Sequence, residues 1–457
     1  ALGLRQHPAR QTRRTFPLPH RVCCRHRLAS IRPMRVFKHR LAYLLAITTL
    51  IVSVGRLGDL TGRRRLLQAG VILFTIASIA CGFATTLWML IAARAVQGLG
   101  AAIMMALTMA FVGEIVPKER TGSAMGLLGT MSAIGTALGP SLGGVLIAEW
   151  SWRALFLINV PLGLAAFLMV LHYLPRDRKH GGHGHVRMDH PGMALMALTL
   201  TAYALAMTLG RGAFGPLNMA LLLSAAVGAA VFVHAETKAA LPLIQLSLFR
   251  DARLSANLLM SGLVSTVVMT TLVVGPFYLS RALGLGAAVV GMVMSVGPLV
   301  AALTGVPAGR SVDRFGTPSM TLLGLLGMTA GCFTLCMLPM AAGIGGYVAS
   351  ISITTAGYAL FQTANNTAVM STISAENRGL VSGMLNLSRN LGLITGAAVM
   401  GAVFAFETGT KDITTARPEA VAEGMRFTFA VAAGLIAVAI GIATRVRVVA
   451  GRAEGSR

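Results

Sequence analysis

Charged side chains are scarce in this chain of 457 residues, and acidic ones are scarcer than basic ones. Charged residues make up 12% of the sequence, against roughly a quarter in soluble domains, and only 15 residues are Asp or Glu. The chain is therefore not an ordinary soluble protein. No apolar stretch carries a His/Glu cluster or paired carboxylates, so we expect no enzyme activity, no cofactor and no metal site. The 5 cysteines imply no disulfide framework.

Long apolar runs are what the chain has in abundance, with 55% hydrophobic residues and a mean hydropathy of +0.73. Runs of about 20 residues can cross a hydrocarbon core of roughly 30 Å as helices, in which the backbone satisfies its own hydrogen bonds. We therefore expect an all-α polytopic protein in the lipid bilayer of a cell membrane. The expected spans are 41–54, 66–84, 87–116, 122–148, 155–174, 191–209, 216–235, 256–279, 287–308, 319–340, 344–371, 379–406 and 425–444.

The net charge of +24 could indicate a nucleic-acid partner, but the positions of the cations favour a membrane topology instead. Eleven of the 39 Lys and Arg residues lie in residues 1–40. Of those in the loops, twenty fall in one alternating set, from Arg56 to Arg457, and six fall in the other. The positive-inside rule makes the larger set cytoplasmic, and with it the C-terminus. We expect no nucleic-acid partner.

The spacing Gly-x-x-x-Asp-x-x-Gly occurs twice, each time on the side expected to be cytoplasmic. Its members are Gly55, Asp59 and Gly62, followed by Arg63 and Arg64, and then Gly309, Asp313, Arg314 and Gly316. Such a repeat indicates two related halves, 41–174 and 256–449, with a substrate site between them near the bilayer midplane. Residues 175–255 would hold a cytoplasmic loop, two extra spans and a linker, and residues 450–457 a cytoplasmic tail.

The two halves differ at their beginnings. In the second half the span 256–279 precedes the span that leads into the motif, whereas no equivalent span precedes 41–54. Residues 1–40 contain no acid, and their longest uncharged run is far shorter than a span requires. We interpret them as a basic leader outside the membrane, whose native origin is open, and we expect the first helix of the first half to be missing.

Five stretches occur in order at a consistent spacing: GRLGDLTGRRR at 55–65, RAVQGLGAA at 94–102, GTALGPSLGG at 135–144, WSWRALFLINVPLG at 150–163 and LNLSRNLG at 385–392. Together they resemble the major facilitator superfamily, and within it the fourteen-span drug:proton antiporters of the EmrB/QacA type. The resemblance covers about residues 41–449, and Leu60 departs from it where a basic residue is usual. It implies a major facilitator fold, with two six-helix halves and two extra central spans.

The resemblance assigns the first motif to conformational gating. Asp59 and Arg63 would belong to a set of charge contacts that hold one conformation and break during alternation. A carboxylate near a helix N-terminus is also favoured by the helix dipole, and glycines allow a tight turn. The alternative is a solvated loop that only fixes the membrane topology.

Two arginines lie deep inside expected spans, where a cation is unfavourable unless it faces a cavity or finds a partner. Arg94, with Gln97 one turn further on, and its second-half counterpart Arg389 would lie in the polar interior and tune the protonation of a nearby acid. Snorkelling to the interface is the alternative. Uncharged polar residues of the span 344–371 would line the cavity or only bridge helices: Tyr358, Gln362, Asn365 and Asn366.

Glycines recur at four-residue spacing in the span 122–148. Gly135, Gly139 and Gly143, with Pro140 and Gly144, predict a kinked helix with a smooth face on which a neighbouring helix slides. Plain helix packing without a role in coupling is the alternative.

The resemblance implies a secondary active multidrug efflux transporter, a monomer that exports lipophilic or amphipathic small molecules in exchange for protons by alternating access. The alternatives are a proton-independent facilitator, an exporter of an endogenous metabolite and a transport-defective truncated form. No Asp or Glu lies deep in any expected span. Glu114, the nearest acid, is close to the cytoplasmic end of 87–116, so the proton carrier is unassigned.

Overall fold

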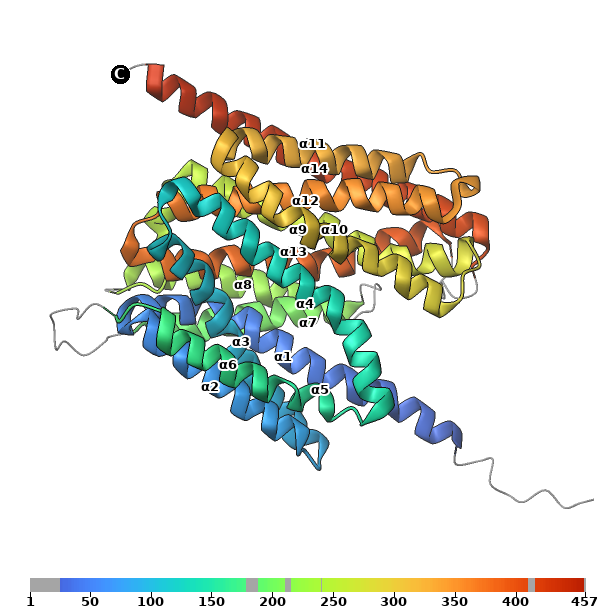
Figure 1. The fold of residues 1–457 in the computed structure, drawn as a ribbon, viewed down its shortest axis with the longest axis horizontal. Coiled ribbons are helices and arrows are strands. Elements are labelled where there is room, and N and C mark those ends of the chain that lie inside the picture. Colours follow the sequence, from blue (N-terminus) through green and yellow to red (C-terminus); the bar gives the residue numbers. More distant parts are fainter. Residues whose placement is uncertain (1–24, 178–187, 210–214, 240, 410–415, 456–457) are drawn as a thin grey trace, which may run out of the picture.

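The computed structural model describes residues 25–177, 188–209, 215–239, 241–409 and 416–455. Within these ranges every regular element is a helix (Figure 1). Thirteen of the described helical segments are long and apolar enough to cross a membrane. The expected all-α polytopic fold is therefore confirmed.

The helices follow the order expected along the chain. They are α1 (Arg25–Thr61), α2 (Arg63–Gly82), α3 (Leu87–Ile115), α4 (Thr121–Glu149), α5 (Ala154–Leu157), α6 (Asn159–Tyr173), α7 (His190–Leu209), α8 (Pro216–Lys238), α9 (Ala252–Phe277), α10 (Ala287–Phe315), α11 (Thr317–Cys336), α12 (Gly343–Thr372), α13 (Arg378–Glu407) and α14 (Pro418–Gly455). The span expected at 155–174 is divided at Ile158 into α5 and α6, and α9 continues as a π turn over Tyr278–Ala282.

The first expected span, 41–54, is too short. Helix α1 begins at Arg25 and continues through the motif to Thr61, so Asp59 projects from its last turn and not from a loop. Residues 1–24 of the expected leader lie outside the described residues. The turn itself is at Gly62, with φ of 106°, and Gly316 takes the same place between α10 and α11 with φ of 83°. Glycine reaches this left-handed region without a steric penalty, which explains why both motifs end in glycine.

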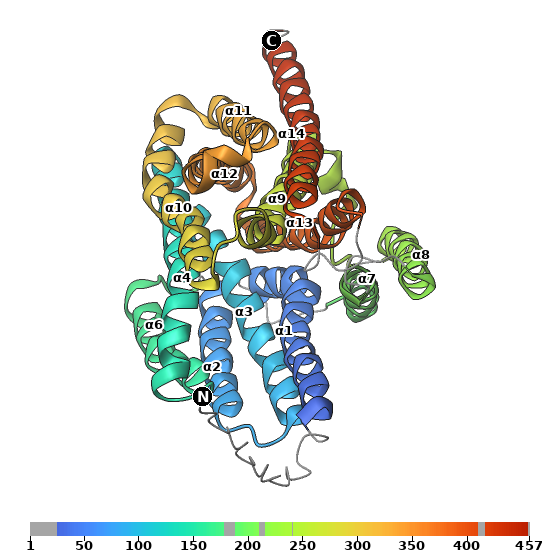
Figure 2. The same cartoon turned by 90° about the vertical axis from the view of Figure 1, so that its right-hand side faces the viewer.

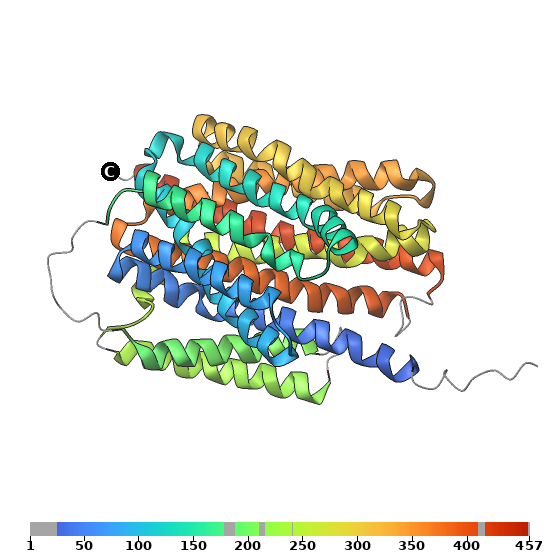
Figure 3. The same ribbon diagram turned by 60° about the horizontal axis from the view of Figure 1, so that its bottom comes forward.

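Two groups of helices lie side by side, α1–α6 and α9–α14, and α7 and α8 lie at the outside of the bundle (Figure 2). Helix α7 contacts α1 and α13, and α8 packs on α7. Figure 3 shows this pair as a green layer along one edge of the molecule. The extra central spans therefore flank the contact between the halves and do not line its centre.

Two helices of each half pack against the other half. Helix α4 packs on α10, and α1 packs on α13. Glycines permit these close approaches, because a Cβ built on Gly309 would lie 2.5 Å from the Gly122 carbonyl oxygen, and one on Gly383 would lie 2.7 Å from that of Ile51. We call the end of the bundle where Asp59 and Asp313 lie the motif end; α14 also ends on this side (Figure 1, left).

The glycine face expected on α4 is unpacked in this conformation. A Cβ built on Gly135, Gly139 or Gly144 would meet nothing within 4 Å, and one on Gly143 would only touch a leucine at 3.4 Å. The expected contact with a sliding neighbour is therefore absent among the residues that the structure describes, and the kink at Pro140 stays a prediction.

Helix α13 shows what such a face does when it is covered. A Cβ built on Gly396 would lie 2.6 Å from the Thr266 carbonyl oxygen, and Gly392 is equally tight against the backbone of α9. Helix α9 packs on the glycine face of α13, but no described helix packs in the same way on the glycine face of α4. The open face of α4 is explained by this difference between the halves.

Candidate functional site

Asp59 connects the two halves at the motif end. Its carboxylate accepts hydrogen bonds from the backbone N–H groups of Gly379, at 2.9 Å, and Leu380, at 2.8 Å. These two residues begin α13, so their N–H groups have no partner within the helix. A carboxylate there satisfies both donors and also interacts favourably with the helix dipole.

Arg63 holds the Asp59 carboxylate from the other side. Its guanidinium donates to Asp59 Oδ1 from Nε, at 3.0 Å, and from Nη2, at 2.7 Å, while Nη1 lies 2.6 Å from Glu114 Oε2. Nη2 also donates to the Ala375 carbonyl oxygen of the second half. The Asp59 side chain is 1% exposed. We call Asp59, Arg63, Glu114 and the start of α13 the first latch.

Asp313 makes the matching contact from the second half. Its Oδ1 accepts from the Gly122 N–H at 2.7 Å, and its Oδ2 accepts from the Ser123 N–H at 2.8 Å and the Ser123 hydroxyl at 2.5 Å. Helix α4 begins at Thr121, so this is again a carboxylate on a helix N-terminus of the other half. Arg314 lies over the Phe315 ring instead of on the aspartate. We call this contact the second latch.

Arg64 belongs to a different contact, which sequence reasoning missed. Asp177, after α6, accepts from the backbone N–H groups of Arg64, at 2.9 Å, and Arg65, at 3.1 Å, and thereby caps α2. The Arg64 side chain donates to the Leu171 carbonyl oxygen at 2.6 Å. This cluster joins parts of the first half only. Asp177 follows directly on α6, and an acid at that position was the available signal.

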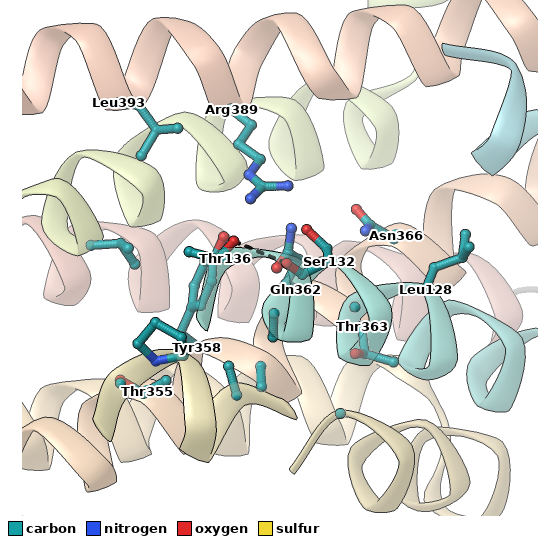
Figure 4. Close-up of a pocket in the computed structure, with 18 of the residues that line it drawn as sticks. Leu128, Ser132, Thr136, Thr355, Tyr358, Gln362, Thr363, Asn366, Arg389 and Leu393 are labelled. Carbon is teal, nitrogen blue, oxygen red and sulfur yellow. Dashed lines mark hydrogen bonds between the residues drawn. The ribbon is translucent and has the colours of Figure 1, made fainter. Parts of the chain in front are cut away.

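A cavity of about 510 Å³ lies between the halves, lined by α3, α4, α9, α10, α12 and α13. Its wall combines methionines with uncharged polar side chains. The methionines are Met104, Met105, Met109, Met125 and Met294, and the polar side chains include Ser132, Thr136, Tyr358, Gln362 and Asn366. Arg389 projects from α13 into this space, facing Gln362 of α12 and Ser132 and Thr136 of α4 (Figure 4).

The structure separates residues that the sequence placed together. Asn366 lines the cavity, whereas its neighbour Asn365 is buried away from the lining, and its side-chain oxygen accepts no hydrogen bond from any described residue. Asn386, one turn before Arg389 on α13, also lines the cavity and donates to the Ser382 carbonyl oxygen at 3.0 Å.

Arg94 is not among the residues that line the cavity. Its guanidinium lies 4.0 Å from the centre of the Tyr43 ring and donates to Gln97 Oε1 at 2.6 Å, and Gln97 in turn donates to the Ser78 hydroxyl at 2.7 Å. Gln97 is 1% exposed. The expected pairing of Arg94 with Gln97 on one helix face is present, but this polar chain lies between α1, α2 and α3 within the first half.

A second buried carboxyl group escaped the sequence analysis. Glu236, in the last turn of α8, is 3% exposed and accepts from the Ile244 N–H at 3.2 Å through Oε2. Its Oε1 has no hydrogen-bond partner among the described residues. Asp189 lies beside it and caps α7 by accepting from the Gly192 N–H at 2.9 Å. The pair fixes the segment between α8 and α9 at the edge of the bundle.

A repeated fold with cross-half helix contacts and a central cavity is typical of secondary transporters. The sequence model of the Major Facilitator Superfamily matches residues 41–397 and, in a second match, residues 254–454. The chain belongs to the major facilitator superfamily. As a member of this superfamily it is a membrane transporter and not an enzyme.

Other major facilitator proteins resemble the chain over most of its length. It is 31% identical to the uncharacterized transporter YebQ of Escherichia coli K12, over 79% of this chain and 78% of YebQ. It is also 31% identical to the multidrug resistance protein Stp of Mycobacterium tuberculosis, over 80% of this chain and 68% of Stp. The crystal structure of the human organic anion transporter MFSD10 matches with a TM-score of 0.63, covering 90% of this chain and 83% of that one, at 15% identity, which shows a shared fold alone.

Proposed function

We propose that the chain is a secondary active exporter, which moves lipophilic or amphipathic small molecules out of the cell in exchange for protons by alternating access. The observation that carries this proposal is the cavity between two halves that are joined at the motif end by the two latches. Similarity to the multidrug resistance protein Stp supports the substrate class.

The orientation follows from charge. The helix ends at the motif end carry Arg56, Arg63, Arg64 and Arg65, and α14 ends on the same side. Under the positive-inside rule this end faces the cytoplasm. The latched conformation is then closed toward the cytoplasm, and the unpacked glycine face of α4 lies toward the outside.

The two latches supply the conformational switch. Each consists of a carboxylate on two N–H groups at the start of a helix in the other half, so opening the cytoplasmic side must separate charge from helix dipole in both places. Glu114 joins the first latch through Arg63, which connects its carboxylate to opening and closing. A latch of this kind stabilises one end state and makes the exchange between states all-or-none.

Inverted membrane vesicles that contain the chain test the proposal. When respiration acidifies the vesicle lumen, a fluorescent amphipathic dye should accumulate inside, and nigericin, which dissipates the pH gradient, should release it. Arg281→Gln, a substitution of an exposed residue at the opposite end, should behave as the parent. Dye movement that nigericin does not change would indicate a facilitator. If no dye moves although the chain is expressed normally, transport by this chain would be contradicted.

A further inference from the structure

Arg389 is the one ionised side chain among the described residues that line the cavity. It is the twelfth residue of α13, which places it roughly 16 Å along a helix of about 44 Å. This depth is near the middle of a membrane, where a cation is unfavourable unless it has a partner or is solvated.

Within the ranges that the structure describes, the surroundings of Arg389 provide no counter-charge. Both ion pairs among the described residues belong to Arg63, at the motif end. The Arg389 Nε is buried and donates to no acceptor in the described part of the chain. Across the cavity the guanidinium faces the uncharged side chains of Gln362, Ser132 and Thr136 (Figure 4). The structure therefore presents a planar cation, suited to bidentate contacts with an oxyanion, in the wall of a substrate-sized space.

The rest of the wall suits the apolar body of a ligand. Five methionines line the cavity, and methionine is flexible and polarizable, so it adapts to ligands of different shape. Gln362 and Asn366 add hydrogen-bond donors that an anionic group can use, and no described carboxylate is present to attract a cation.

We infer that the central cavity selects amphipathic anions, compounds with a carboxylate or sulfonate group on an aromatic or aliphatic body, and that Arg389 binds the anionic group. This assignment rests on the proposed function, since it names the substrate class of the same cavity. The positive potential at Arg389 also disfavours cationic amphiphiles in this conformation, because a like charge in a low-dielectric space is repelled.

Equilibrium binding to the purified chain in detergent tests this inference separately from transport. Three dansyl probes share one fluorophore and differ in charge: dansyl-glycine is an anion, dansylamide is neutral, and dansyl-cadaverine is a cation. Dansyl emission rises in an apolar site, so one titration format serves all three. At neutral pH we expect dansyl-glycine to bind at least tenfold more tightly than dansylamide, and dansyl-cadaverine to bind most weakly.

Three substitutions assign the preference to Arg389. Arg389→Lys keeps the charge and should retain the order of affinities. Arg389→Gln should reduce dansyl-glycine affinity about tenfold, to the level of dansylamide, and leave dansylamide unchanged. Arg281→Gln, at an exposed position away from the cavity, should leave all three affinities at the parent values.

The outcomes separate the two hypotheses. Tighter binding of dansyl-cadaverine than of dansyl-glycine, an unchanged ratio in Arg389→Gln, or no saturable binding of any probe overturns the anion assignment. If Arg389→Gln does not fold, the order of affinities in the parent and in Arg389→Lys still decides. Anion-selective binding without pH-driven dye accumulation in vesicles would contradict the proposed exporter and leave the binding assignment standing.

Discussion

Removing the negative charge of Asp59 should open the motif end of the protein. Asp59→Asn keeps the size of the side chain and one acceptor oxygen. Its amide NH₂ group, however, can only donate, and it would face donors: the N–H groups of Gly379 and Leu380 or the guanidinium of Arg63. The substitution therefore weakens the hydrogen bonds to Gly379 and Leu380, which exist only while the two halves are together.

The magnitude follows from the burial and geometry of the first latch. The carboxylate is 1% exposed and makes charge-assisted hydrogen bonds of 2.7 to 3.0 Å, so solvent screening is weak. Only the hydrogen bonds to Gly379 and Leu380 cross between the halves, and a hydrogen bond to a charged group contributes about 1.5–3 kcal/mol. We take about 3 kcal/mol for the two together, because asparagine keeps one acceptor oxygen and Arg63, four residues away in the same half, stays beside residue 59 in both states. The ratio of latched to open molecules should then fall by roughly a hundredfold, since about 1.4 kcal/mol corresponds to tenfold.

Distance measurement by pulsed electron spin resonance can detect this change. Thr61 and Glu376 are exposed, lie at the motif end and belong to opposite halves. Spin labels can be attached at these two positions once the native cysteines have been replaced. Asp59→Asn should shift the population from the short distance to a longer one. Asp251→Asn is the matched control, because Asp251 caps only its own helix by accepting from Arg253 N–H. An unchanged distribution in Asp59→Asn, or an equal shift in the control, would refute the latch.

Three further predictions concern Arg94, the two glycine faces and Glu236. Arg94→Ala should insert normally but lose transport and unfold at a lower temperature, because the buried Gln97 Oε1 loses the guanidinium donor at a cost of about 1–3 kcal/mol; efflux at the parent rate would contradict a role of Arg94 in transport. Gly396→Leu should prevent stable folding, since α9 backbone occupies the space, whereas Gly139→Leu should keep the parent melting temperature in detergent and block the transport cycle. Equal melting temperatures for the two variants would contradict the tight packing of the α13 face, and transport at the parent rate by Gly139→Leu would contradict a role of the α4 face in the transport cycle. Glu236→Ala should lower the melting temperature more than Glu236→Gln, because only glutamine keeps an acceptor for the Ile244 N–H, which makes the two variants differ by about 1 kcal/mol in stability. Identical melting curves would show that this hydrogen bond does not hold the segment between α8 and α9.

The sequence alone determined the properties that depend on neighbouring residues. The length and apolarity of each span are local, so thirteen membrane helices and their order could be predicted, with errors at the ends such as the extension of α1 from 54 to Thr61. The repeated motif could be found because both copies end in a glycine that the same left-handed turn requires, at Gly62 and Gly316. The division of the cations between alternate connections likewise predicted which helix ends lie together on one side of the bundle.

Only the tertiary structure decided which side chains meet. Asp59 contacts Gly379 and Leu380, more than 300 residues away, through backbone N–H groups that no side-chain motif could reveal. Arg94 and Arg389 are both cations within spans, yet one is stacked on Tyr43 inside a half and the other lines the cavity. The physical reason is that helical periodicity fixes the angle between residues of one helix, about 100° per residue, but leaves free the rotation of the whole helix against its neighbours. Packing sets that rotation, and it turned Asn366 toward the cavity and Asn365 away from it.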